Sequence, residues 1–179
     1  EKKIIVSYGD SPGFGKPELM LEKSGFAQVA KKHNVPLADF ENDTVVDYPG
    51  GVSCKKFNIA NACLDNDGII SLCKMKTHML ARITGAVKNQ FGCVQGLHKA
   101  SFHVKKPDGI KFSKMLVDLN KIVHPRLFVM DGIVAMEGNG PQGGTPVKMN
   151  CIIISIDPVA VDATFCRMIN LEPKFVATN

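Results

Sequence analysis

A mostly apolar run at residues 68–73, Gly-Ile-Ile-Ser-Leu-Cys, constrains the fold more than any other stretch. Such a run is typical of a strand that is buried on both faces of a parallel sheet. The segment Lys74-Met-Lys-Thr-His78 follows it directly. In open α/β sheets ligands bind beyond the carboxyl ends of the strands, so we expect any chemistry of this chain to centre on that segment.

Apolar runs alternate with helical patterns along the chain. Residues 109–123 repeat apolar side chains at helical spacing, and Asp157 followed by Pro158 is a typical helix start. A helix over 25–33 capped by Ser24, a short strand over 35–40 and a helix that begins after Thr84-Gly85 and runs through Gln90 complete the pattern. This alternation predicts an α/β layered fold with a mostly parallel sheet and helices on both faces. We expect the runs that end at Tyr8, Cys73, Asp131 and Ile156 to lie in that sheet.

The 179 residues fit a single α/β domain or lobe over residues 1–179, and the end of the chain soon after the Asp157 helix suggests a fragment of a longer protein. The formal net charge is +5, yet the chain has two Tyr and no Trp for stacking on bases. This balance favours a small anionic molecule over nucleic acid as the partner. No run approaches the roughly 20 apolar residues of a membrane span, so no membrane partner is expected. The oligomeric state is left open.

Six cysteines are present, and no two of them have the CxxC spacing of a zinc or iron–sulfur site. We therefore expect no iron–sulfur cluster on this chain. Free cysteines behave as small hydrophobic residues in a reducing compartment, so we expect mostly buried thiols and a cytoplasmic location.

The candidate site residues surround the end of the predicted strand. Lys74, Lys76 and His78 alternate, so in a strand their side chains point to one side, although a solvated basic rim explains the same alternation. Lys88 and Asn89 follow on the next predicted helix. Residues 98–106 form the densest basic segment and are interpreted as a solvated face.

Acidic and glycine-rich candidates come at and after the end of a second predicted strand, over residues 126–131. Asp131 and Glu137 come after its carboxyl end, and a glycine-rich loop with Asn139 and Gly140 comes next. That loop matches the letters of a dinucleotide fingerprint, but a strand follows where a helix should begin. Residues 9–16 likewise lack the spacing and the Ser or Thr of a P-loop. A tight turn explains the second loop, and either loop could still offer backbone N–H groups to an anion.

Together these motifs resemble the family called domain of unknown function 362. The matching pieces, which run in order through almost the whole chain, are Gly9-Asp-Ser-Pro-Gly13, Lys74-Met-Lys-Thr-His78, Thr84-Gly-Ala-Val-Lys-Asn89 with Phe91-Gly-Cys93, Met130-Asp131 leading to Met136-Glu-Gly-Asn-Gly-Pro-Gln-Gly-Gly144, and Asp157-Pro-Val-Ala-Val-Asp162. Many members carry a ferredoxin-like iron–sulfur segment, which the cysteine spacing here lacks.

A shorter stretch is similar to the amino-terminal domain of the nickel-dependent lactate racemase family. His78 and Lys88 fit that pattern, and His103 lies near the histidine that helps to hold the metal cofactor there. The resemblance implies a role for His103 in metal binding, and it leaves room for a metal-containing cofactor whose identity is open.

The functional hypothesis is part of an enzyme that acts on an anionic substrate with His/Lys acid–base chemistry. Lys76 and Lys88 would orient the substrate, His78 would exchange a proton near neutral pH, and residues 137–144 would form another wall of the pocket. The alternative is a non-catalytic redox-partner or scaffold lobe of an iron–sulfur protein whose cluster segment is absent here.

Overall fold

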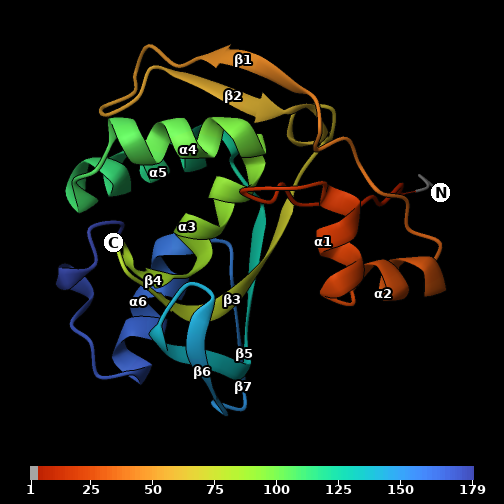
Figure 1. The fold of residues 1–179 in the computed structure, drawn as a ribbon. Coiled ribbons are helices and arrows are strands. Elements are labelled where there is room, and N and C mark those ends of the chain that lie inside the picture. The colour runs from red at the N-terminus through yellow and green to blue at the C-terminus, as the bar shows by residue number, and fades with distance from the viewer. Residues whose placement is uncertain (1–3) are drawn as a thin grey trace.

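The structure, a computed structural model, describes residues 4–179. In chain order its elements are α1 (Pro17–Lys23), α2 (Phe26–Lys32), β1 (Asp43–Asp47), β2 (Lys56–Ala60), η1 (Asn61–Cys63), β3 (Ile70–His78), β4 (Arg82–Thr84), α3 (Ala86–Asn89), η2 (Gln90–Cys93), α4 (Gly96–Lys105), α5 (Gly109–Val123), β5 (Leu127–Asn139), β6 (Gly143–Val147), β7 (Cys151–Ser155), α6 (Pro158–Met168) and η3 (Pro173–Phe175). The chain is thus α/β (Figure 1).

The main sheet is mixed, so the prediction of a mostly parallel sheet is wrong. Its strands run in the order β4-β3-β5-β6, with β7 also paired to β5. Only β3 and β5 are parallel, whereas β4, β6 and β7 pair antiparallel with their neighbours. Parallel neighbours need a long crossover connection. After β5 the chain turns back through a hairpin instead, which brings β7 alongside β5 in the opposite direction.

The amino-terminal strand is also absent from this sheet among the described residues. Tyr8 forms a single bridge with Leu37, and residues 4–7 belong to no strand. The predicted strand over 35–40 reduces to this same bridge. The part of the predicted first strand before residue 4 lies outside the described residues. An apolar, β-favouring run becomes a strand only where a neighbouring strand pairs with it.

Helices α3 and α6 pack on one face of the sheet. Cys73, Met75 and Met130 of the strands are buried there against Val161 and Phe165 of α6. On the opposite face Ile70, Leu72, Ile152 and Ile154 are between 55% and 62% exposed. The expectation of helices on both faces is therefore not met in the part of the chain that the structure describes.

Several helix predictions are confirmed. Helix α5 has the predicted bounds, and Phe112, Met115, Leu116 and Leu119 are fully buried in a second core beside β2. Asp157 caps α6 by accepting hydrogen bonds from the backbone N–H groups of Val159 and Ala160. Helix α2 begins instead after Gly25, whose φ of 83° suits glycine, while Ser24 ends α1.

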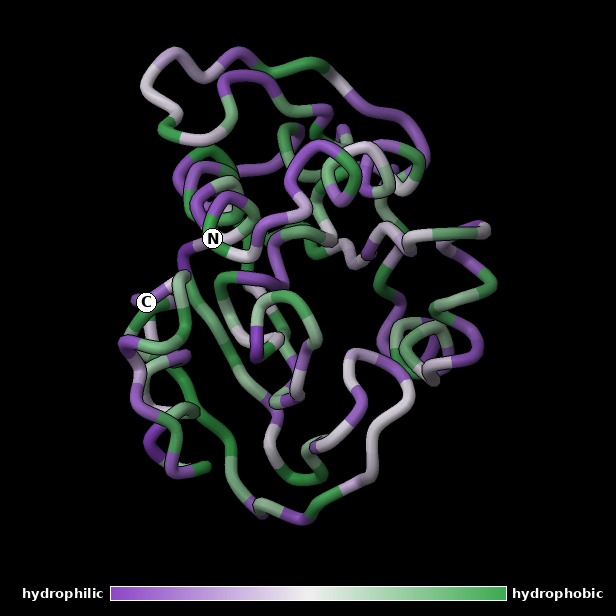
Figure 2. The backbone as a smooth tube through the Cα atoms, turned by 60° about the vertical axis from the view of Figure 1, so that its left-hand side comes forward, coloured by the Kyte–Doolittle hydropathy of each residue, from purple (hydrophilic) through white to green (hydrophobic). Residues whose placement is uncertain are grey.

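No helix in the described part of the chain is long and apolar enough to cross a membrane. Figure 2 shows short hydrophobic and hydrophilic stretches alternating along the backbone.

Asp118 of α5 ties the loop between β1 and β2 to the helix. Its carboxylate accepts hydrogen bonds from three consecutive backbone N–H groups, those of Val52 at 3.0 Å, Ser53 at 2.7 Å and Cys54 at 2.9 Å. The side chain is buried, at 2% exposure. These charge-assisted bonds supply the partners that the loop backbone would otherwise lack.

Replacing Asp118 with Ala should lower the free energy of unfolding by about 2–3 kcal/mol, because three backbone donors lose their acceptor. Urea denaturation measures this. Asp67→Ala, at an exposed position, is the control and should change it by less than about 0.5 kcal/mol. Equal effects of the two substitutions would show that the loop does not depend on Asp118.

Candidate anion site

The candidate site begins where the loop around residues 10–13 packs on η2 and α4. The backbone N–H of Ser11 donates to the carbonyl of Gly92 at 3.2 Å. A Cβ at position 92 would lie 2.3 Å from Oδ1 of Asp10, and one at Gly96 would lie 2.5 Å from the Pro12 carbonyl oxygen. Glycine at these two positions is therefore what permits the loop to approach so closely.

Three lysines from three different elements gather beside this loop. Lys76 lies on β3, Lys88 on α3 and Lys99 on α4. The Nζ atoms of Lys88 and Lys99 lie 5.8 and 5.9 Å from the centroid of the Phe91 ring. Lys99 is 8% exposed and donates to the carbonyl of Ser11. The buried ring and the loop thus hold the two ammonium groups near each other.

Burial lowers the pKa of each of these lysines. For Lys88 the pKa falls to about 8, first through burial and then through the positive charges of Lys76 and Lys99. For Lys76 and Lys99 the lowering by burial is opposed by the negative charge of Asp10. Within residues 4–179 none of the three forms a contact ion pair with a carboxylate. The cluster therefore carries more positive charge than the carboxylates of residues 4–179 balance.

Asp10 is the acidic member of the cluster. The residue as a whole is exposed, but its carboxylate end is packed against Gly92. The resulting desolvation raises the pKa of the Asp10 carboxyl, while Lys99, the Ser11 N–H and Lys76 act in the opposite direction. Asp10 thus balances part of the charge of Lys76 and Lys99.

His78 lies at the end of β3 in a fixed orientation. Its Nδ1 accepts the backbone N–H groups of Leu80 and Ala81, both at 3.1 Å. The ring proton of the neutral imidazole is consequently on Nε2. Burial, followed by the charges of Lys88, His103 and Lys76, lowers the pKa of His78 to about 4. The side chain is therefore neutral near pH 7 and suits hydrogen-bond donation better than the proton exchange expected from the sequence.

His103 lies on α4 and packs between the aromatic rings of Phe91 and Phe112. Its ring stacks on Phe112 at 4.9 Å between centroids and meets the Phe91 ring edge-on at 5.6 Å. Burial and the charge of Lys88 lower its pKa. No group of three or more His, Cys, Asp or Glu side chains that could hold a metal ion occurs in residues 4–179. The neighbours of His103 are thus two aromatic rings, Lys88 and His78.

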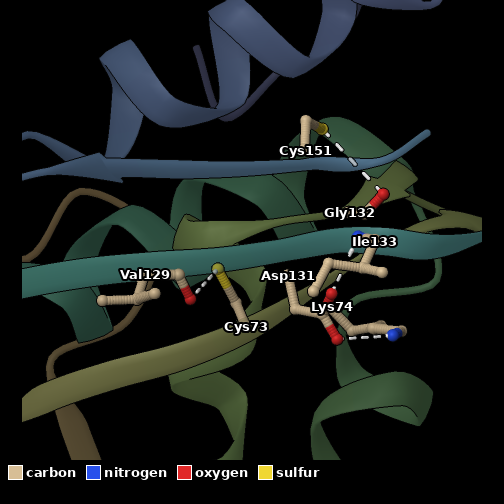
Figure 3. Close-up of polar contacts among 7 residues, drawn as sticks. All are labelled: Cys73, Lys74, Val129, Asp131, Gly132, Ile133 and Cys151. Atoms are coloured by element: carbon tan, nitrogen blue, oxygen red, sulfur yellow. Dashed lines mark hydrogen bonds and ion pairs between the residues drawn. The ribbon is translucent and has the colours of Figure 1, made fainter.

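Two other predicted members pair elsewhere. Asp131 lies 2.6 Å from Nζ of Lys74 and also accepts the backbone N–H of Ile133 (Figure 3). The hydrogen bond from Lys74 holds the pKa of Asp131 below its usual value. Asp131 is not among the charges that shift the pKa of Lys88 or His78. The structure therefore joins Asp131 to Lys74 and not to the three-lysine cluster.

The side-chain amide of Asn89 is engaged in hydrogen bonds within the fold. Its Nδ2 donates to the Ser71 hydroxyl and to the Leu72 carbonyl, which fastens α3 to β3.

The glycine-rich hairpin of β5 and β6 lies against the end of β3. The Thr77 hydroxyl donates to the Gly138 carbonyl at 3.0 Å, and a Cβ at Gly140 would lie 2.1 Å from the Thr77 carbonyl oxygen. The hairpin thus contacts Thr77, the residue directly before His78. Glu137 and Asn139 are exposed, and Glu137 does not shift the pKa of Lys88 or His78. Their predicted part in the site stays a prediction.

Asp162 fixes the helix that carries Lys88. Its carboxylate, 1% exposed, accepts the backbone N–H groups of Ala86 at 2.6 Å and Val87 at 3.1 Å. Burial raises its pKa to about 7, against the effect of those two hydrogen bonds. The sequence suggests that Asp162 complements the dipole of its own helix, whereas the structure shows it capping α3.

Sequence reasoning missed Asp10, Phe91 and Lys99. The sequence favours a solvated face for the segment that holds Lys99, because a run of charged residues usually forms one. The signal lay in its spacing: residues 96–105 are helical, so Lys99 and His103, four positions apart, share one face. Asp10 belongs to a motif of the family resemblance, but only the folded loop shows which groups it meets.

A cavity of about 210 Å³ is also lined by residues of this loop. It is lined by Ser11, Pro12, Gly13, Phe14, Gly15, Pro17, Phe40, Glu41, Gln95, Gly96 and Leu97. Glu41 is the charged member of that lining. The three-lysine cluster is the stronger candidate for chemistry, because its charge is unbalanced.

We predict that the His78 imidazole stays neutral, with its proton on Nε2, from about pH 5.5 to pH 8. Nitrogen-15 NMR of the histidine rings measures both the tautomer and the titration. A His78 resonance that titrates near pH 6.5, or a proton on Nδ1, would contradict the geometry described here.

Comparison with known proteins places the chain in a family. A thylakoid-associated protein of Synechocystis sp. is 33% identical over 171 residues, which cover 95% of this chain and 53% of that protein. The chain thus spans about half the length of this relative. Residues 1–167 match the profile of the family described as "Domain of unknown function (DUF362)". With a match over nearly its whole length and a relative at this level of identity, the chain belongs to the domain of unknown function 362 family.

Proposed function

We propose that this chain binds a small molecule bearing two negative charges, through phosphate or carboxylate groups, as the substrate-binding part of an enzyme. The observation that carries the proposal is the charge of the cluster. The carboxylate of Asp10 acts on Lys76 and Lys99, whereas the charges that act on Lys88 are both positive. Three lysines thus face one carboxylate within the described residues, which leaves two positive charges without a partner there.

The energetic argument concerns the cost of burying charge. Moving an ammonium group out of water is expensive unless a counter-charge or hydrogen bonds compensate for it. The lowered pKa of Lys88 reflects this cost. A bound dianion would supply the missing counter-charge and accept hydrogen bonds from Lys76 and Lys88. The Nε2–H of His78 is a further donor for the same ligand.

The acid–base role moves from His78 to Lys88 in this proposal. A group exchanges protons best when its pKa is close to the working pH. The pKa of about 8 gives Lys88 that property, and the pKa of about 4 leaves His78 as a neutral donor.

We also propose a cytoplasmic location, supported by six free cysteines in the described chain, four of them buried. The Synechocystis relative is described as thylakoid-associated, and fractionation of the native host cell tests the proposal for this chain.

Lys88→Ala should weaken the binding of sulfate, a simple dianion, by about 1.5–3 kcal/mol, because a charge-assisted hydrogen bond is lost. Isothermal titration calorimetry measures the affinity. Folding should be nearly unchanged, since Lys88 is half-buried and donates no hydrogen bond in the described residues.

Lys74→Ala is the matched control. Lys74 lies on β3, and its charge is already paired with Asp131. Its loss should therefore leave sulfate binding within about twofold. The proposal fails if the unmodified protein does not bind sulfate, phosphate or malonate, or if both lysine variants lose affinity equally.

A further inference from the structure

We propose that Lys88 is a nucleophile whose ε-amine forms an imine with a carbonyl compound carrying an anionic group beside the carbonyl, as in a 2-oxo acid. This inference rests on the proposed anion site and names its substrate class.

The surroundings of Lys88 distinguish it from the other two lysines. Lys99 is buried and donates to the Ser11 carbonyl. Lys76 and Lys99 both feel the negative charge of Asp10, which favours their charged form. The charges that act on Lys88 are those of Lys76 and Lys99, both positive. Among the three, Lys88 is therefore the amine that the site holds least firmly as an ammonium ion.

Lys88 is also reachable. Its side chain is half-buried, donates no hydrogen bond within residues 4–179 and places Nζ over the Phe91 ring, 5.8 Å from its centroid. A partly desolvated amine next to other cations is the arrangement that activates lysine as a nucleophile. With a pKa of about 8, roughly a quarter of the Lys88 side chains carry a free amine at pH 7.5.

The reaction is balanced without an oxidant or a reductant. The lone pair of the neutral Nζ attacks the carbonyl carbon, and a proton moves from nitrogen to oxygen to give a carbinolamine. Loss of the hydroxyl group as water leaves the imine, so one amine and one carbonyl give one imine and one water. The Nε2–H of His78 can donate a hydrogen bond to the oxygen that departs.

The neighbouring lysines determine the substrate class. The Nζ atoms of Lys88 and Lys99 lie 5.8 and 5.9 Å from the centroid of the same Phe91 ring, and the charge of Lys76 also acts on Lys88. An anion bound to Lys76 and Lys99 would therefore bring its own carbonyl toward Nζ of Lys88. In a 2-oxo acid the carboxylate is directly bonded to the carbonyl carbon, so the two groups can reach neighbouring amines of one cluster. Neutral aldehydes lack the group that the two lysines would hold.

Reductive trapping tests the inference. The protein is incubated with glyoxylate, the simplest 2-oxo acid, and sodium cyanoborohydride at pH 7.5, and the modified lysines are located by peptide mass spectrometry. Lys88 should react at least tenfold faster than Lys74, whose ammonium is paired with Asp131. Added sulfate should protect Lys88 and leave Lys74 unaffected.

Two variants separate reactivity from binding. Lys88→Arg keeps the positive charge and removes the nucleophilic amine, so it should retain sulfate binding within a few-fold and lose the modification at position 88. Lys76→Met removes one cation that lowers the pKa of Lys88, so that pKa should rise and the modification of Lys88 should require a higher pH.

The outcomes distinguish the two proposals. If sulfate binds but Lys88 reacts no faster than Lys74, the imine inference is wrong and the anion site stands. If Lys88 reacts selectively although sulfate neither binds nor protects it, the anion site is wrong, and so is the assignment of an anionic substrate. Modification spread evenly over the lysines, without protection, would overturn the inference.

Discussion

The arrangement of the site depends on the contact between Asp162 and the start of α3. The carboxylate comes from α6, 75 and 76 residues away in sequence from the two backbone N–H groups that it binds. This contact caps a helix of four residues that is too short to be stable alone. Because Lys88 follows the capped residues directly, the same contact determines where its side chain can reach. The geometry of the lysine cluster is thus a product of long-range packing.

Keeping the three ammonium groups of the cluster close together and partly out of water costs free energy. Cation–π contacts with Phe91 and the hydrogen bond from Lys99 to the loop hold ammonium groups where Asp10 balances only part of their charge. Such an arrangement lowers the stability of the empty protein, and a ligand of opposite charge can recover that energy. Preorganised cations of this kind require little rearrangement when an anion arrives.

The local features of this fold could be predicted from the sequence, and the long-range ones could not. The period of α5 and the Asp157-Pro158 start of α6 are local signals, and both are confirmed. The direction of β7 depended on whether the glycine-rich segment is a hairpin or a crossover, and the burial of Lys99 depended on which loop covers α4. The tautomer of His78 depends on the two backbone donors that follow it, and its neutral state depends on burial and on neighbouring positive charges, neither of which the motif shows.

The central claim is that Lys88 belongs to an anion site and becomes fully protonated when a simple dianion such as sulfate, which has no carbonyl group to react with the amine, fills that site. Since its pKa in the empty site is about 8, a bound dianion should raise that pKa, and binding at pH 8 should take up close to half a proton. Titrations with sulfate in two buffers of different ionisation enthalpy measure this uptake directly. The account predicts proton uptake at pH 8, little at pH 6, and an affinity that falls about tenfold per pH unit above the pKa of Lys88. An affinity that is constant from pH 6 to pH 9.5, or uptake that persists unchanged in Lys88→Arg, would contradict it.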